Sequence, residues 1–216
     1  KISEFRRIIE FLIDEPITNV AMAGQIRPQI LFDKKVFQDE ELRELMSDLK
    51  DRRADSIFGA IAQKLEANGL KVLDSTLFLE KYLPPKGILT KEEPSQEVWD
   101  DINFGFQIAK EIARLDIGQT VVVKNKTVVA VEAFEGTDAT IRRAGYIAPR
   151  GCVVVKVSKP KQDKRFDIPV AGLNTIRNLI KIKAQCLAFE AGRTLLIDKD
   201  KCIELASRNN IIIAAV

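Results

Sequence analysis

Histidine is absent from all 216 residues of this chain, and its absence narrows the chemistry that the chain can perform. Without histidine, the chain cannot build a Ser-His-Asp triad, a Cys-His nucleophile or a His-ligated zinc site by itself. Acid–base and metal chemistry must therefore come from carboxylates, lysines or a tyrosine.

Cysteine is also scarce. The three cysteines, Cys152, Cys186 and Cys202, are widely spaced among apolar residues and show no Cys-x-x-Cys or other zinc spacing. This pattern predicts buried thiols in a reducing compartment rather than a disulfide framework.

The sequence shows no signal peptide and no apolar run long enough to cross a bilayer. We therefore expect a cytoplasmic protein, with contact to a membrane surface left open. A net charge of +3, with both signs mixed along the chain, argues against a nucleic-acid partner. The chain opens at Lys1 directly into an amphipathic helical pattern, from which we expect that upstream residues are missing.

Helical and strand patterns alternate in the first part of the chain. This alternation predicts a Rossmann-like α/β domain over residues 1–85, truncated at its start. The elements that we expect are helices over 3–14, 40–49 and 56–67, strands over 19–23 and 70–73, and a short helix that begins at Asp74 or Ser75 and runs to about Leu83.

A segment rich in proline and charge, 86–94, is predicted to link this domain to a second one over 95–216. The second domain is predicted to be a mixed-sheet α/β domain, which gives two small α/β domains in all. Its expected elements are a helix capped by Ser95, a hairpin of 120–124 and 127–132 that turns at Asn125-Lys126, helices over 136–144, 174–191 and 199–208, and strands over 152–157, 194–197 and 211–215.

The first candidate site runs from Glu132 to Arg143. A strand, a glycine turn at Gly136 and a helix that begins at Thr137 or Asp138 form a natural seat for an anion. The acidic residues could instead hold a metal, or Asp138 could simply cap the helix. Glu132 and Glu135 favour a bound cation, because neighbouring carboxylates repel each other.

The second candidate site runs from Lys156 to Pro169. Its cations suit phosphate, and its paired aspartates suit a hard divalent metal such as Mg²⁺. The expected strand 152–157 would place Lys156 and Lys159 at the carboxyl edge of a sheet, where open α/β sheets bind ligands. A period of two would place Asp163, Arg165 and Asp167 on one side of an extended segment. A solvated charged loop is the alternative.

A third candidate, Met22–Pro28, also joins a strand end to a glycine and a cation, Arg27, but by itself it predicts little more than a turn.

Together these motifs resemble the LpxI-type UDP-2,3-diacylglucosamine pyrophosphatases. The resemblance is carried by the segments Met22–Pro28, Asp116–Val123, Val131–Asp138, Lys159–Pro169, Glu190–Gly192 and Leu195–Asp198. It implies two α/β domains with the lipid bound between them, and it suggests that the N-terminal part is lacking. It also implies an enzyme of lipid A synthesis at the inner membrane, which hydrolyses UDP-2,3-diacylglucosamine to UMP and 2,3-diacylglucosamine 1-phosphate with Mg²⁺.

Combining these motifs with the needs of phosphoryl hydrolysis assigns roles to individual residues. Three groups follow: the catalytic residues Asp163, Asp167 and Asp138; the substrate-binding residues Lys159, Gln162, Arg165, Thr137, Gly136 and Arg27; and the metal ligands Asp163, Asp138 and Glu135. Two alternatives stay open, namely a non-catalytic module that binds a sugar nucleotide or phospholipid and a transferase that acts on nucleotide sugars. A homodimer is left open as the oligomeric state.

Overall fold

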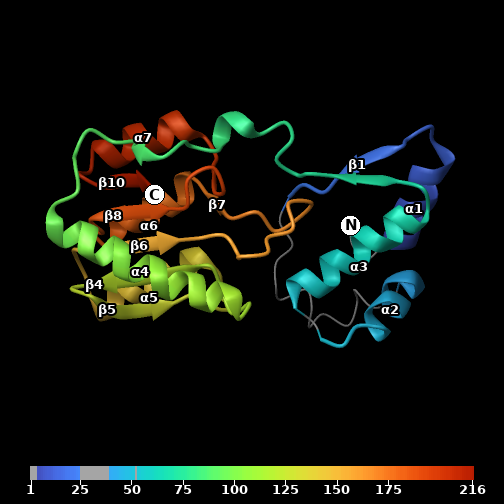
Figure 1. The fold of residues 1–216 in the computed structure, drawn as a ribbon, viewed down its shortest axis with the longest axis horizontal. Coiled ribbons are helices and arrows are strands. Elements are labelled where there is room, and N and C mark those ends of the chain that lie inside the picture. The colour runs from blue at the N-terminus through green and yellow to red at the C-terminus, as the bar shows by residue number, and fades with distance from the viewer. Residues whose placement is uncertain (1–3, 25–38, 52) are drawn as a thin grey trace. The chain divides into compact units, whose positions relative to one another are not determined.

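The computed structural model describes residues 4–24, 39–51 and 53–216, which form two compact units (Figure 1). The N-terminal unit takes in the chain up to Phe78 and, from much later in the sequence, Asp163–Asp167. The C-terminal unit consists of Leu79–Gln162 and Ile168–Val216. Both units combine helices and strands, which confirms the predicted α/β class.

The described residues of the N-terminal unit form three helices and a small parallel sheet that share one apolar core. The amphipathic first helix buries Phe5 and Ile9 there, as its periodicity predicts. Each element lies within a few residues of its predicted place: α1 (Phe5–Asp14), β1 (Asn19–Ala21), α2 (Glu40–Ser47), α3 (Ala54–Ala67) and β2 (Lys71–Leu73).

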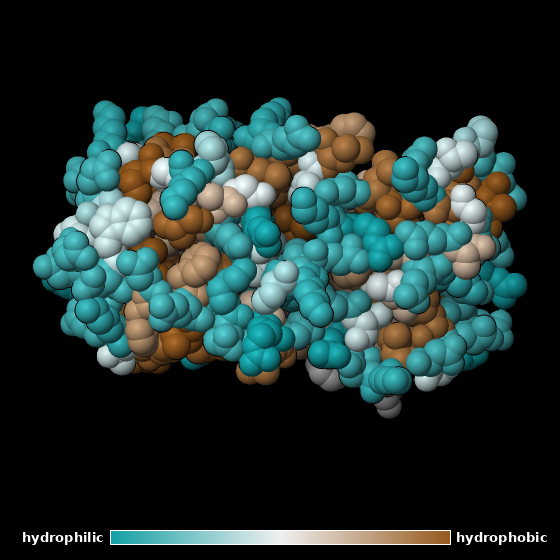
Figure 2. Space-filling model, viewed as in Figure 1, coloured by the Kyte–Doolittle hydropathy of each residue, from teal (hydrophilic) through white to brown (hydrophobic). Residues whose placement is uncertain are grey.

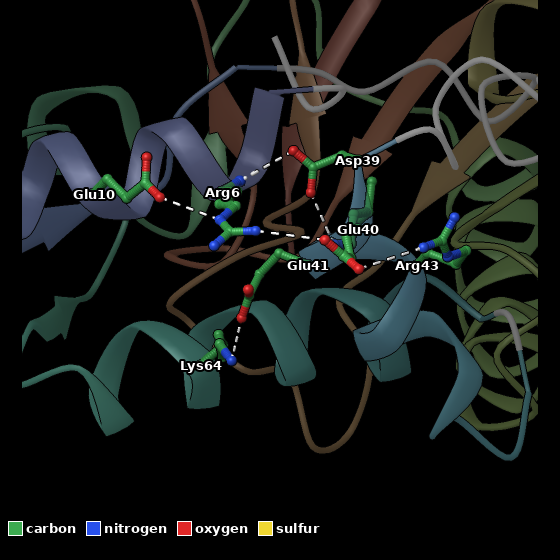
Figure 3. A network of polar contacts seen from close by, with 8 residues as sticks. Arg6, Glu10, Asp39, Glu40, Glu41, Arg43 and Lys64 are labelled. Carbon is green, nitrogen blue, oxygen red and sulfur yellow. Dashed lines mark hydrogen bonds and ion pairs between the residues drawn. The ribbon is translucent and has the colours of Figure 1, made fainter.

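Polar contacts join the helices of this unit at its surface (Figure 3). Asp39 caps α2 by accepting the amide of Leu42 at 2.9 Å, and its other oxygen accepts the amide of Arg6 at 3.1 Å. Lys64 of α3 forms an ion pair with Glu41 of α2. Arg6 is exposed, whereas Asp39, Glu41 and Lys64 are half-buried, and we assign these contacts to the orientation of the helices.

The predicted short helix after β2 is wrong. Asp74 accepts hydrogen bonds from the amide and the hydroxyl of Thr76, at 2.7 and 2.6 Å, and so closes a turn. Only the 3₁₀ turn η4 (Glu80–Tyr82) follows. Aspartate and serine serve turns as readily as helix caps, so local sequence does not separate the two outcomes.

The segment Asp163–Asp167 contributes a side chain to the core of the N-terminal unit. Phe166 is 5% exposed, and its ring centroid lies 5.7 Å from that of Phe58 on α3. The amide and hydroxyl of Ser75 both donate to the carbonyl oxygen of Lys164, at 2.8 and 3.0 Å. The segment is therefore anchored within this unit, not a freely solvated charged loop.

The C-terminal unit is built on a six-stranded mixed sheet in the order β3-β10-β8-β6-β4-β5. Strands β10, β8 and β6 run parallel at its centre, while β3, β4 and β5 are antiparallel to their neighbours. The strands are β3 (Gly87–Ile88), β4 (Thr120–Lys124), β5 (Thr127–Val131), β6 (Val153–Lys156), β8 (Cys186–Phe189) and β10 (Ile212–Ala215). Strand β3 lies within residues 86–94. The assignment of these residues as the linker between two domains stays a prediction.

Helices cover both faces of this sheet (Figure 1). Val121 and Val123 of β4 pack on the side of α4 (Gln96–Arg114), whereas Val122 packs on the opposite side, as the alternation of a strand requires. The helices on that opposite side are α5 (Thr137–Ile147), α6 (Leu173–Lys181) and α7 (Lys199–Ser207). Each layer thus buries one face of the sheet.

The predicted β4–β5 hairpin is confirmed. Asn125 and Lys126 both adopt left-handed backbone conformations, with φ of 51° and 55°. Their amides donate to the buried carboxylate of Asp101, at 2.9 and 2.6 Å. An acidic residue of α4 therefore holds the turn.

The predicted helix over 174–191 is wrong in its second half. Helix α6 ends at Lys181, Lys183 adopts a φ of 52°, and the chain continues as the fully buried strand β8. A short apolar run fits a buried strand and a buried helix equally well, which explains the error. The expected strand 194–197 forms as β9 (Leu195–Leu196), but it pairs with β7 (Val170–Ala171) outside the main sheet.

Within the described ranges, no helix is long and apolar enough to cross a membrane. On the face shown in Figure 2, hydrophilic side chains are interspersed with hydrophobic ones.

We predict that Phe166→Ala destabilises the N-terminal unit by about 3–5 kcal/mol, because the change leaves a cavity beside Phe58. Hydrogen exchange of the amides in α3 and β2 would measure the effect. Phe11→Ala is the matched control, since Phe11 is 59% exposed and its loss should cost little. Equal effects of the two changes would contradict the anchoring role of Phe166.

Candidate active site

The carboxyl ends of the parallel strands meet at one edge of the C-terminal sheet. Lys156 ends β6 and lies beside Phe189, which ends β8, and beside Thr120, which begins β4. Strand β5 ends at the same edge, and α5 begins a few residues after it. The predicted position of Lys156 at the end of a central strand is confirmed, and this edge is where α/β sheets bind ligands.

A hydroxyl group joins two buried charges at this edge. Thr137 Oγ1 donates to Glu132 Oε1 at 2.8 Å and accepts a hydrogen bond from Lys156 Nζ at 2.6 Å. Thr120 Oγ1 lies 3.3 Å from the same hydroxyl, and Gln119 N donates to Glu132 Oε2 at 3.3 Å. Glu132 is 8% exposed and Lys156 is 6% exposed. The first residue of α5 is thereby tied to the ends of β5 and β6.

Gly118 permits this arrangement by its lack of a side chain. A Cβ atom at Gly118 would lie 2.1 Å from the carbonyl oxygen of Glu132 and 3.1 Å from its Cβ atom. Any larger residue would therefore displace the backbone that carries the Glu132 carboxylate.

A second buried network fixes the chain just beyond β6. Glu190 Oε2 accepts hydrogen bonds from the amide and hydroxyl of Ser158, at 2.9 and 2.6 Å, and from Lys110 Nζ at 3.0 Å. Burial raises the pKa of Glu190, but the bonds from Ser158 and Lys110 outweigh it and hold this pKa below its usual value. The carboxylate is therefore charged when it holds the chain that leads to Lys159.

Lys159 is itself buried and ion-paired. Its ammonium lies 2.7 Å from Asp116 Oδ1, and its amide donates to Gln162 Oε1 at 3.1 Å. Two predicted substrate-binding residues, Lys159 and Gln162, are thus in direct contact in a tight turn.

At the start of α5, the alternative that Asp138 caps the helix is wrong. The N-cap is Gly136, with a φ of 81° and no side-chain cap. Asp138 Oδ2 accepts a hydrogen bond from Asn174, whereas its buried Oδ1 has no hydrogen-bond partner among the described residues.

Glu135 is engaged with a cation of the chain itself. Its Oε1 lies 2.6 Å from Arg143 NH2 on α5. Burial raises the pKa of Glu135, but hydrogen bonds, first among them the one from Arg143, outweigh it and lower the pKa. Arg143 therefore supplies the positive charge that the nearby carboxylates require.

The other predicted residues belong to the N-terminal unit. Asp163 accepts three hydrogen bonds from the side chain of Arg165, the shortest at 2.7 Å, and Arg165 also contacts Glu66 at 2.7 Å. The Arg165 guanidinium lowers the pKa of Asp163 below its usual range. Asp167 adopts a left-handed φ of 55°, so the segment is not the regular extended chain that a period of two assumes.

The structure therefore divides the predicted site residues into two groups. Gly136, Thr137, Asp138, Glu135, Lys159 and Gln162 belong to the C-terminal unit, and Asp163, Arg165 and Asp167 belong to the N-terminal unit. Arg27 lies outside the described residues. Across the parts of the chain that are described, no group of three or more His, Cys, Asp or Glu could hold a metal ion.

Several residues of the two networks were not predicted as site residues: Glu132, Lys156, Thr120, Asp116, Ser158, Lys110 and Glu190. A signal existed for Glu132 and Lys156, since each is a charged residue that directly follows or ends a β-branched strand. Ser158 lies within the second candidate segment, and Asp116 and Glu190 lie in segments that carry the resemblance, but the motifs assigned them no role, because their contacts join segments that are distant in the sequence.

We predict that Glu190→Gln lowers the stability of the C-terminal unit at about pH 7 by about 1–3 kcal/mol, since it removes a charged acceptor shared by Ser158 and Lys110. The folded-state pKa of Glu190 is depressed, so its contribution is present above the unfolded pKa and is lost as the pH falls through the folded one. The difference from wild type should thus shrink below about pH 4 in urea unfolding.

Glu111→Gln serves as the control, because Glu111 pairs with Arg114 on the exposed surface of α4. A difference for Glu190→Gln that stayed constant from neutral to acidic pH would argue against a charged Glu190.

Both units match models of known protein domains. Residues 1–82 match the model of the LpxI N-terminal domain, and residues 85–214 match that of the LpxI C-terminal domain. The expectation that the N-terminal part is lacking is therefore wrong, because residues 1–82 represent that domain.

One curated relative is the UDP-2,3-diacylglucosamine pyrophosphatase LpxI of Caulobacter vibrioides. It is 32% identical over an alignment of 226 residues, which covers 100% of this chain and 80% of the relative. With two domain models in sequence order and this identity over its whole length, the chain belongs to the LpxI family.

Proposed function

We propose that this protein hydrolyses the pyrophosphate bond of UDP-2,3-diacylglucosamine, and so releases UMP and 2,3-diacylglucosamine 1-phosphate in lipid A biosynthesis. The observation that carries the proposal is the full-length relationship to a pyrophosphatase of that substrate. The buried basic and hydroxyl groups at the carboxyl edge of the C-terminal sheet support it, because they suit the oxygens of a diphosphate.

In the proposed site, the turn after β6 and the start of α5 bind the diphosphate. Gly136 leaves the first amides of α5 without a side-chain cap, and such amides bind phosphate oxygens. Thr137 adds a hydroxyl, and Lys159 and Gln162 add an ammonium and a carboxamide. Asp116 and Glu190 hold this turn in place, the first through Lys159 and the second through Ser158.

We propose that Asp163 orients the water that attacks phosphorus. Hydrolysis requires a positioned water and an ionised carboxylate that can accept a hydrogen bond from it. The guanidinium of Arg165 keeps Asp163 ionised and fixes its orientation. Asp167 and Asp138 are proposed to assist. The buried Oδ1 of Asp138, which has no hydrogen-bond partner in the described parts of the chain, is available to accept a hydrogen bond.

A requirement for Mg²⁺ rests on the family resemblance and on the oxygen chemistry of Asp163, Asp138 and Glu135. In the structure, Asp163 is paired with Arg165 and Glu135 with Arg143, and the described residues form no three-ligand cluster. The donor set of these residues alone does not fit a metal site, so we assign no step to the ion.

The two acyl chains of the proposed substrate place the reaction at the inner membrane surface, where we propose that the protein associates peripherally.

We predict that Asp163→Asn lowers kcat for UMP release by roughly 100-fold or more and changes KM little, because a group that orients water acts mainly in the transition state. The measurement is UMP release from UDP-2,3-diacylglucosamine in detergent micelles. Glu66→Gln is the matched control, since it removes the other acidic partner of Arg165 and should leave kcat nearly unchanged. A near-normal kcat for Asp163→Asn would exclude the role proposed for Asp163.

We also predict that excess chelator abolishes UMP release by the wild-type protein and that Mg²⁺ restores it, since Mg²⁺ commonly binds through the phosphate oxygens of a substrate with only one or two protein ligands. Zn²⁺ should restore the activity less well. Full turnover in chelator would show that cations of the protein alone neutralise the diphosphate.

A further inference from the structure

Lys156 is a buried cation that forms no ion pair with the described residues. Its residue is 6% exposed, and among the described residues its ammonium has one hydrogen-bond partner, Thr137 Oγ1, at 2.6 Å. An ammonium group carries three N–H donors, so two of them have no acceptor in the described parts of the chain. Burial of a cation with unused donors is unfavourable unless something else compensates the charge.

Two other lysines near the same edge each have a direct counter-charge. Lys159 lies 2.7 Å from a carboxylate oxygen of Asp116, and Lys110 lies 3.0 Å from one of Glu190. Among the residues that the structure describes, Lys156 has only an indirect counter-charge, Glu132, which bonds to the opposite side of the Thr137 hydroxyl. The hydroxyl thus separates the two charges and leaves Lys156 free to meet an anion.

The surroundings of Lys156 favour an anion over a cation. Thr137 is the first residue of α5, a helix of 11 residues whose N-terminal end has a positive partial charge. The N-cap Gly136 provides no side chain there, and a Cβ atom built on it would meet nothing within 4 Å. The Thr137 hydroxyl therefore lies between two sets of unused donors. One set is the first amides of α5, and the other is the N–H groups of Lys156.

We propose that Lys156 is a substrate-binding residue that binds a phosphoryl oxygen of the diphosphate, and that Glu132 positions it through Thr137. Glu132 accepts a hydrogen bond from the Thr137 hydroxyl, which turns a lone pair of that hydroxyl toward Lys156 and fixes the ammonium beside the start of α5. This inference rests on the proposed function and adds to it two residues, Lys156 and Glu132, that the motifs did not predict as site residues.

A purely structural role gives a different expectation. If Lys156 only balances the charge of Glu132, a variant that neutralises both residues regains the pyrophosphate binding and the activity that the single change at Lys156 loses. If Lys156 binds the diphosphate, the neutral pair folds but does not bind. The double variant Glu132→Gln/Lys156→Met separates the two roles, because coupling between neighbours is measured by such a cycle.

The first test is thermal unfolding of the full chain with inorganic pyrophosphate as the probe. Wild type should unfold at a higher temperature in millimolar pyrophosphate, as should Lys126→Met, an exposed-lysine control on the β4–β5 turn. Lys156→Met and the double variant should show no such rise. A rise in both of these that matches wild type would overturn the proposal.

The second test is kcat/KM for UDP-2,3-diacylglucosamine. Lys156→Met should lower it by roughly 100-fold, Lys156→Arg by less, and the double variant should not recover it. Recovery in the double variant to the wild-type value would show that Lys156 is only a counter-charge. If wild type releases no UMP, the proposed function fails, whereas the pyrophosphate comparison still decides whether Lys156 binds an anion.

Discussion

The C-terminal unit depends on the stabilisation of charged side chains that are buried at the carboxyl edge of its sheet. Glu132, Lys156 and Lys159 are each less than 9% exposed at the carboxyl edge, and every such charge needs partners to remain there. The partners come from separate segments: Thr137 at the start of α5 contacts Glu132 and Lys156, and Asp116, just after α4, pairs with Lys159. Glu190, just after β8, holds the neighbouring Ser158 and pairs with Lys110. Satisfying the charges therefore fixes the loops that form the edge, and a fixed edge is what a diphosphate site requires.

The residues of a single motif, Lys159–Pro169, are divided between the two compact units. Lys159 and Gln162 lie in the C-terminal unit, but the next five residues belong to the core and the polar contacts of the N-terminal unit. Phe166 anchors this segment among apolar side chains, and Arg165 holds Asp163 in an ionised state. The orientation of Asp163 thus depends on the integrity of the N-terminal unit, although the cations proposed to bind the diphosphate lie in the C-terminal unit.

Sequence patterns predicted most elements because period and turn chemistry are local. The Asn125-Lys126 turn and the Ser95 cap follow from residue types alone. The boundary between α6 and β8 was missed because a buried strand and a buried helix have the same apolar composition. The motifs located the segments of the site, but they did not assign a role to every charged residue within them. The roles of Lys110, Asp116 and Glu190 were missed, since these roles arise from contacts between distant segments.

The central claim is that Lys156 keeps unused donors at the start of α5 for an anion. The most direct measurement is NMR of the side-chain ammonium groups in protein labelled with ¹⁵N-lysine, during a titration with inorganic pyrophosphate. The account predicts one slowly exchanging ammonium signal that is absent in Lys156→Met and that shifts as pyrophosphate binds. A Lys156 signal that stays unchanged at saturating pyrophosphate, while that of another lysine moves, would contradict the account.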